Sequence, residues 1–172
     1  MASQTPSYGQ ILSLSYPRTR CLGRSPTVVV GLGYWTINKR PELREGVLHI
    51  SSSKVDAFFV TLQKTEEEYS PTTMYEDYLI SHDTFHWQSQ SKISPESETG
   101  KRYINHKNLG YTPMLFVRVS KKLDSGLSAP YFYLGPCEYE SHSGSKPISI
   151  IWKLKCRVPA RLYRQMATQS TG

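Results

Sequence analysis

Short runs of aromatic and β-branched residues, each bounded by polar or turn-forming residues, recur through most of this chain. Such runs are typical of β-strands, because these side chains fit well on a pleated, half-buried surface. Gly46 and the triplet Asp124-Ser125-Gly126 mark breaks between runs. The runs that we expect to form strands are 47–50, 56–62, 74–80, 85–87, 114–119, 130–135 and 148–154. Residues 138–140 either extend the strand 130–135 or pair with it.

Helical periodicity is weak except near the C-terminus, where a helix is expected over 159–166 with Pro159 at its start. The pattern therefore predicts a mainly β (α+β) fold. We expect a compact barrel-like or strongly bent antiparallel or mixed sheet with a few short helices.

The length of 172 residues fits one domain. Residues 1–30 are rich in Ser, Pro, Gly and Arg, and we expect them to be a poorly ordered or divergent N-terminal segment. Residues 31–166 are expected to form a single β-rich domain, followed by a tail over 167–172.

The net charge of +7 is distributed unevenly along the chain. Residues 1–53 carry 6 basic and 2 acidic side chains, residues 54–100 carry 3 and 9, and residues 101–172 carry 12 and 3. The C-terminal part therefore has a balance of +9, which favours a polyanion such as DNA or RNA as a partner. A basic, solvated surface without a partner is the alternative.

No apolar run approaches the ~20 residues that a membrane-spanning helix needs, and the N-terminus has no secretory pattern. The three cysteines are widely spaced and form no metal-binding or disulfide pattern. We therefore expect a cytoplasmic protein without a membrane partner.

Distinctive segments over about two thirds of the chain follow the order of a known family. They are 44–47, 59–62, 69–78, 85–91, 100–106, 115–118, 134–136 and 147–154. The chain resembles the family called domain of unknown function 3427, which usually forms the C-terminal domain of restriction-type DEAD/DEAH-box helicases. The resemblance implies an association with DNA-processing or restriction systems.

Two departures limit what the resemblance implies. The phosphate-binding motif of the helicase motor, Gly-x-x-x-x-Gly-Lys-Ser/Thr, is absent from the sequence. The segment that comes nearest to it, 95–102, has Pro95 in place of the first glycine. Residues 1–30 do not follow the family pattern. The resemblance therefore does not imply an ATP-driven activity for this chain.

The stretch 85–90 mixes aromatic, imidazole and amide groups. If it is extended, Phe85 and Trp87 point to the core while His86, Gln88 and Gln90 line an open face suited to base edges or phosphates. The alternative is a half-buried strand whose polar face meets only water.

A second candidate segment follows Gly100. Lys101 and Arg102 supply cations, and Asn105 and His106 add further donors for a phosphate. The alternative is an exposed basic turn. We expect both segments to lie on one surface that attracts anions.

Catalytic and metal-binding patterns are weak. His82 and His86 are four residues apart, but the intervening Asp83-Thr84-Phe85 supplies no Glu for the metalloprotease motif. No Asp or Glu is followed two places later by Lys, as many nucleases require. We therefore expect a binding domain rather than an enzyme, with no metal and no cofactor.

The sequence thus predicts a nucleic-acid-binding accessory domain of a helicase- or restriction-type system, without its own motor. Its partners would be DNA, with single-stranded and modified DNA as alternatives, and a helicase or nuclease. A protein-interaction module that positions such an enzyme, or an inactive truncated fragment, are the competing hypotheses.

Overall fold

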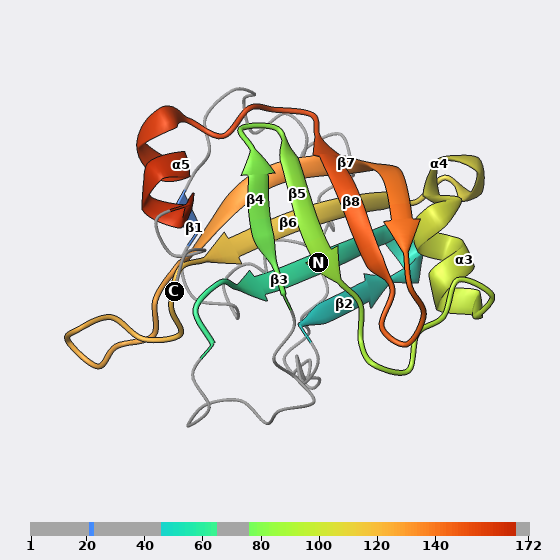
Figure 1. Ribbon diagram of the computed structural model, residues 1–172, viewed down its shortest axis with the longest axis horizontal. Helices are drawn as coiled ribbons and strands as arrows, with labels where there is room; N and C mark the ends of the chain where they lie inside the picture. Colours follow the sequence, from blue (N-terminus) through green and yellow to red (C-terminus); the bar gives the residue numbers. More distant parts are fainter. Residues whose placement is uncertain (1–20, 23–45, 65–75, 168–172) are drawn as a thin grey trace, which may run out of the picture.

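The computed structural model describes residues 21–22, 46–64 and 76–167 (Figure 1). The strands are β1 (Cys21–Leu22), β2 (Val47–Ile50), β3 (Val55–Thr61), β4 (Tyr78–Ser81), β5 (Thr84–Gln88), β6 (Thr112–Arg118), β7 (Tyr131–Ser143) and β8 (Ser149–Leu154). The helices are the 3-10 turn η1 (Ser51–Ser53), α3 (Glu98–Ile104), α4 (His106–Leu109) and α5 (Ala160–Ala167).

The strands form one mixed sheet in the order β2-β3-β6-β7-β8-β5-β4, and β1 pairs with the start of β7. The pair β3–β6 is parallel and the other pairs are antiparallel. The predicted mainly β class with a mixed sheet is confirmed. The barrel-like form is not supported, because the sheet remains open between β2 and β4 in the part of the chain described here.

Strand β7 is long and connects the two halves of the sheet. Its first part pairs with β6, and from Cys137 onward it pairs with β8. Gly135, with φ +107°, and Pro136 lie at the change of partner. A positive φ is accessible to glycine without strain, so the strand can bend here. In Figure 1, β4, β5 and β8 consequently cross in front of β2, β3 and β6.

The main hydrophobic core lies between these two halves. Phe58 of β3 stacks on Trp87 of β5 with ring centroids 4.4 Å apart, although three strands separate β3 from β5 in the sheet. Trp152 of β8 is 5.4 Å from Phe58, and Tyr103 of α3 meets it edge-on. The folded-over sheet thus encloses a core rich in aromatic residues, which favour such offset and edge contacts.

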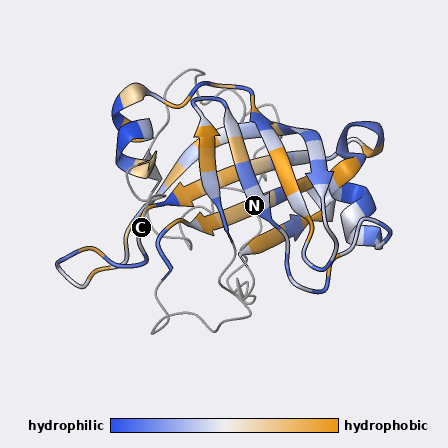
Figure 2. Cartoon of the chain, viewed as in Figure 1, coloured by the Kyte–Doolittle hydropathy of each residue, from blue (hydrophilic) through white to orange (hydrophobic). Residues whose placement is uncertain are grey.

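A second cluster covers the opposite face of β3 and β6. Phe59 stacks on Phe116 at 5.0 Å, and Tyr131 meets Phe59 edge-on. Both faces of β3 are therefore buried, which explains its continuous apolar run. Figure 2 shows apolar residues along much of β3 and β6.

The C-terminal helix predicted over 159–166 is present as α5. It buries Leu162 and Met166, while Tyr163 stacks on His82 at 4.1 Å. None of the helices in the described residues has the length and apolar character to cross a membrane. The assignments made for 1–30 and 167–172 fall outside the described residues, apart from Cys21, Leu22 and Ala167.

Candidate nucleic-acid interface

Strand β5 has the alternation expected from its sequence. Phe85 and Trp87 are buried in the core at 0% and 4% exposure, whereas His86 and Gln88 are partly exposed on the outward face. The cross-strand register places His86 beside Tyr78 of β4, and the two rings stack at 4.6 Å. The prediction that Phe85 and Trp87 serve the core is confirmed.

Both polar side chains on this face already have partners within the protein. The ring Nδ1 of His86 lies 2.7 Å from the carbonyl oxygen of Glu76. The amide of Gln88 accepts a hydrogen bond from the Glu76 N–H at 2.9 Å and donates to Ser149 Oγ at 3.3 Å. A ligand would have to compete with these bonds or use the remaining lone pairs and donors of the two side chains.

The backbone of Gln88 is held by a buried ion pair. Asp77 Oδ1 accepts from the Gln88 N–H at 2.9 Å, and Asp77 Oδ2 lies 2.6 Å from Lys64 Nζ. Burial raises the pKa of Asp77, and Lys64 opposes that shift. The contact fixes the end of β5 and the side chains that it presents.

Gln90 does not share the outward face of β5, because the strand ends at Gln88. Ser89 is fully buried, and its hydroxyl accepts from the Ile148 N–H at 3.0 Å. The Gln90 Oε1 atom is buried without a hydrogen-bond partner among the described residues. The alternation of buried and outward side chains therefore does not extend to Gln90, because the strand has already ended.

The segment around Gly100 forms helix α3, so it is not the exposed basic turn that was the alternative to a phosphate-binding segment. Ser97 caps its N-terminus by accepting from the Gly100 N–H at 3.1 Å, and Glu98 lies in its first turn. Gly100 is needed here for space, because a Cβ would lie 2.0 Å from the carbonyl oxygen of Ser94. The helix is thereby packed tightly against the preceding loop.

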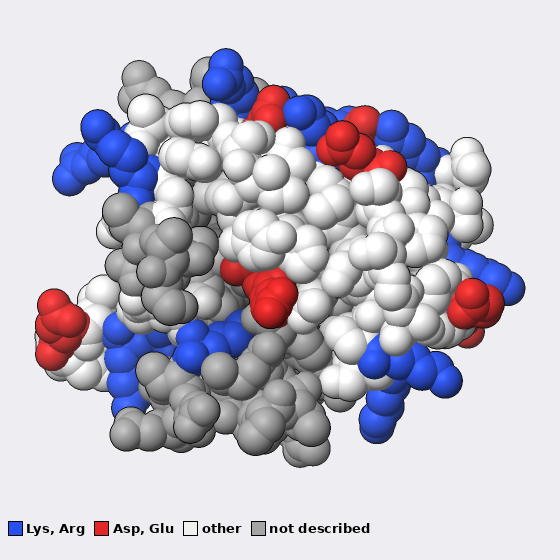
Figure 3. All heavy atoms as spheres, viewed as in Figure 1, with Lys and Arg blue, Asp and Glu red and all other residues white. Residues whose placement is uncertain are grey.

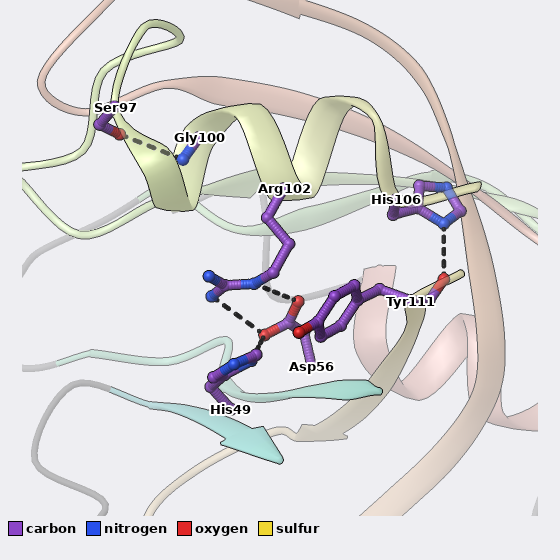
Figure 4. A network of polar contacts seen from close by, with 7 residues as sticks. All are labelled: His49, Asp56, Ser97, Gly100, Arg102, His106 and Tyr111. Carbon is purple, nitrogen blue, oxygen red and sulfur yellow. Dashed lines mark hydrogen bonds and ion pairs between the residues drawn. The ribbon is translucent and has the colours of Figure 1, made fainter. Parts of the chain in front are cut away.

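Arg102 points from α3 toward β3 (Figure 4). Its Nε and Nη2 atoms donate to the two carboxylate oxygens of Asp56 at 3.0 and 3.2 Å. Asp56 is fully buried and Arg102 is 14% exposed. The bidentate geometry that suits a phosphate is used here for an internal carboxylate.

His49 completes this network from β2. Its Nδ1 lies 2.9 Å from Asp56 Oδ1, and its ring stacks on Tyr111 at 5.4 Å. Arg102 also lies over the Tyr111 ring, 5.7 Å from its centroid. This cluster could not be predicted from the local sequence, because only the pairing of β2 with β3 brings His49 opposite Asp56.

His106 is buried at 4% exposure and joins three parts of the chain. Its Nδ1 bonds to the Tyr111 carbonyl oxygen at 3.1 Å, and its Nε2 accepts from the Tyr139 N–H at 3.1 Å. This arrangement needs the neutral ring, and burial lowers the pKa of His106. Lys101 and Asn105 are exposed on the same helical segment, and the Asn105 amide donates to the Lys101 carbonyl oxygen at 3.1 Å.

The seven predicted residues therefore fall into two groups, one at the end of β5 and one on α3 and α4. No hydrogen bond within the described ranges joins the two groups. Their role in binding nucleic acid stays a prediction. His86, Gln88, Lys101 and Asn105 are the members with exposed atoms that a ligand could reach without displacing an ion pair.

Several cations of the C-terminal part are paired with acidic side chains. Glu138 receives both Lys107 at 2.7 Å and Lys155 at 3.1 Å. Lys153 pairs with Asp83 at 3.0 Å, and hydrogen bonds from Lys153 and Ser81 lower the pKa of Asp83 to about 2. These pairs reduce the local excess of positive charge.

Metal-ligating side chains do not gather in groups of three or more within the described ranges. His82, one member of the pair spaced by four residues, bonds through Nδ1 to the Val158 carbonyl oxygen at 2.8 Å. It serves to join α5 to the turn between β4 and β5.

Comparison with protein families gives a match over residues 27–166 to the family described as Domain of unknown function (DUF3427). The chain belongs to this family. The resemblance inferred from the sequence motifs is thereby confirmed for most of the chain. A search of curated proteins finds no match.

Among solved structures, the DUF3427 domain is similar to a chain of the 5-hydroxymethylcytosine-specific restriction enzyme AbaSI. The identity is 17% and the TM-score is 0.41, over 78% of this chain and 34% of that chain. The DUF3427 domain thus spans about a third of the AbaSI chain. Our expectation that the domain is not an enzyme is contradicted by this match, in which the other chain is that of a restriction enzyme; the match itself assigns no activity to the DUF3427 domain.

Proposed function

We propose that this DUF3427 domain binds DNA as part of a helicase- or restriction-type DNA-processing system. The observation that supports the proposal is the composition of the C-terminal segment. From Ser141 to Gly172 the chain contains no Asp or Glu. It contains six cations, Lys146, Lys153, Lys155, Arg157, Arg161 and Arg164.

Helix α5 presents part of this charge to solvent. Arg161 and Arg164 are exposed and three residues apart, so they lie on the same side of the helix. Leu162 and Met166 anchor the opposite side in the core. Arg157 is exposed just before the helix. Figure 3 shows Lys and Arg side chains over α5 at the left end of the molecule.

Cations fixed on a helix attract phosphates and release the counterions that surround DNA. Lys107, Lys153 and Lys155 are held in ion pairs with Glu138 or Asp83, so a phosphate would compete with these carboxylates for them. We assign the phosphate contacts to the α5 arginines, because Arg161 and Arg164 are exposed on one side of the helix. His86 and Gln88 on β5 are the proposed residues for further contacts with DNA, whereas Lys101 and Asn105 lie beside α4, away from α5, and are left out of this contact.

Fluorescence anisotropy with labelled DNA tests this proposal. Duplex, single-stranded and base-modified duplex probes should be titrated over a range of salt concentrations, so that the preferred form is found together with the affinity. We expect binding that weakens steeply with salt. The Arg161→Gln/Arg164→Gln variant should lower the slope of log K against log [salt] by up to about 2, since each lost phosphate contact removes about 1.

Lys107→Gln is the matched control, because it also removes an exposed cation but lies on α4, at the other end of the molecule from α5 (Figure 1). Its salt slope should equal that of the wild type. Absence of binding at low salt to all three probes would overturn the proposal. An equal decrease of the salt slope in Lys107→Gln and in the α5 variant would show that binding depends on the net charge alone and not on the position of the arginines.

The outer face of β4, β5 and β8 favours a second candidate, a protein-interaction module. Figure 3 shows that this face is largely uncharged, and Ile80 on it is 46% exposed. Such a surface suits a protein partner better than a polyanion. Co-purification with a helicase or nuclease that is lost in Ile80→Asp, with DNA binding unchanged, is the result expected for this alternative.

A further inference from the structure

The loop between β6 and β7, residues 119–130, projects from the body of the molecule as a narrow hairpin (Figure 1). Hydrogen bonds within the loop give it a defined shape. The Leu123 N–H donates to the Leu127 carbonyl oxygen at 2.8 Å, and the Ala129 N–H donates to the Lys121 carbonyl oxygen at 3.0 Å. Ala129 is 5% exposed and anchors the base of the hairpin.

Two leucines stand at the tip of this hairpin. Leu123 is 47% exposed and Leu127 is 55% exposed, and these are the two highest values among the large apolar side chains of the described residues. Lys122 bridges to Ser128, so Leu123 and Leu127 lie opposite each other on the next rung. Residues opposite each other in an antiparallel pair place their side chains on the same face.

Positive charge accompanies the leucines. Lys121 and Lys122 precede Leu123, and residues 120–130 carry these two cations against one acid, Asp124. Figure 3 shows Lys and Arg side chains beside this loop, at the same end of the molecule as α5. An apolar tip with flanking cations fits a ligand that has stacked, apolar rings between rows of phosphates.

We propose that the Leu123–Leu127 tip is a wedge that inserts between stacked bases of DNA held by the α5 arginines. Leucine side chains that enter a base step in this way unstack it and bend the duplex. Lys121 and Lys122 would meet the phosphates beside the opened step. The proposal rests on the DNA binding proposed above and adds the place and mode of contact.

A duplex that contains 2-aminopurine at a series of positions reports the insertion, because the emission of this base rises when it leaves the stack. The positions should lie within pyrimidine–purine steps, which unstack most easily. We expect wild-type protein to raise the emission at one or a few positions. Leu123→Ser/Leu127→Ser should abolish the rise and weaken binding about tenfold, since a buried leucine contributes substantially to affinity.

Leu109→Ser is the control for the replacement of an exposed leucine by serine, because Leu109 is 46% exposed on α4, outside the hairpin. It should leave both emission and affinity unchanged. Thermal melting shows whether each variant is folded, and the exposed positions predict unchanged melting.

The outcomes separate the two proposals. If the wild type fails to bind DNA at low salt, the proposed function fails. If it binds but leaves the 2-aminopurine emission unchanged at every position, or if the leucine variants retain the full rise, the wedge alone is refuted. In that case, the exposed leucines serve a different occupant, such as a protein partner.

Discussion

Removal of the Arg102 guanidinium should destabilise the whole domain. Asp56 is fully buried, and among the residues of known position Arg102 donates two hydrogen bonds to its carboxylate and His49 donates a third. In Arg102→Met the apolar stem is retained, but the buried carboxylate loses its bidentate partner. Loss of one member of a buried pair costs about 3–5 kcal/mol, because the other charge remains without compensation.

The expected loss of stability in Arg102→Met lies at the lower end of that range, because Arg102 is 14% exposed and His49 still contacts Asp56. A loss of about 3 kcal/mol corresponds to a fall of roughly 6–12 °C in Tm for a chain of this size. Lys107→Met offers a matched comparison, because its ion pair with Glu138 is as short but Lys107 is 60% exposed. Exposed pairs contribute about 0–1 kcal/mol, so Tm should fall by less than about 4 °C.

Urea unfolding followed by tryptophan fluorescence measures both effects, because Trp87 and Trp152 are buried in the core. The double variant Asp56→Asn/Arg102→Met provides a further check. Asn is neutral, so the double variant lacks the unpaired charge, and it should recover part of the stability lost in Arg102→Met.

Equal and small losses of stability in Arg102→Met and Lys107→Met would refute the reasoning that burial decides how much an ion pair contributes to stability. A double variant less stable than Arg102→Met would show that the cost comes from lost packing rather than from an unpaired carboxylate.

Two further predictions concern Gly100 and His106. Gly100→Ala should destabilise the protein by about 1–3 kcal/mol in the same urea assay, because the new methyl group meets the Ser94 carbonyl oxygen; wild-type stability would show that α3 can shift without cost. Burial lowers the pKa of His106, so below the ordinary histidine pKa of about 6.5 the unfolded chain binds a proton that the folded protein excludes. The stability contributed by His106 is therefore present above that pH and is lost as the pH falls. The Tm measured from about pH 7.5 to pH 5 should therefore fall less in His106→Gln than in the wild type. Parallel profiles in the wild type and His106→Gln would contradict the assignment.

Local patterns determined much of the secondary structure. The alternation in β5 identified Phe85 and Trp87 as core residues, and the apolar and basic periodicity near the C-terminus identified α5. These features depend on neighbours a few positions apart, so they can be read along the chain. The family motifs could likewise be recognised in the sequence, and the match over residues 27–166 confirms them.

Long-range pairing decided what the polar residues do. Arg102 and Asp56 are 46 positions apart, and His106 and Tyr139 are 33 positions apart. Nothing in the local sequence distinguishes an arginine that meets a phosphate from one that neutralises a buried carboxylate. Only the parallel pairing of β3 with β6, and the packing of α3 at the end of the core, bring the internal partners within hydrogen-bond distance.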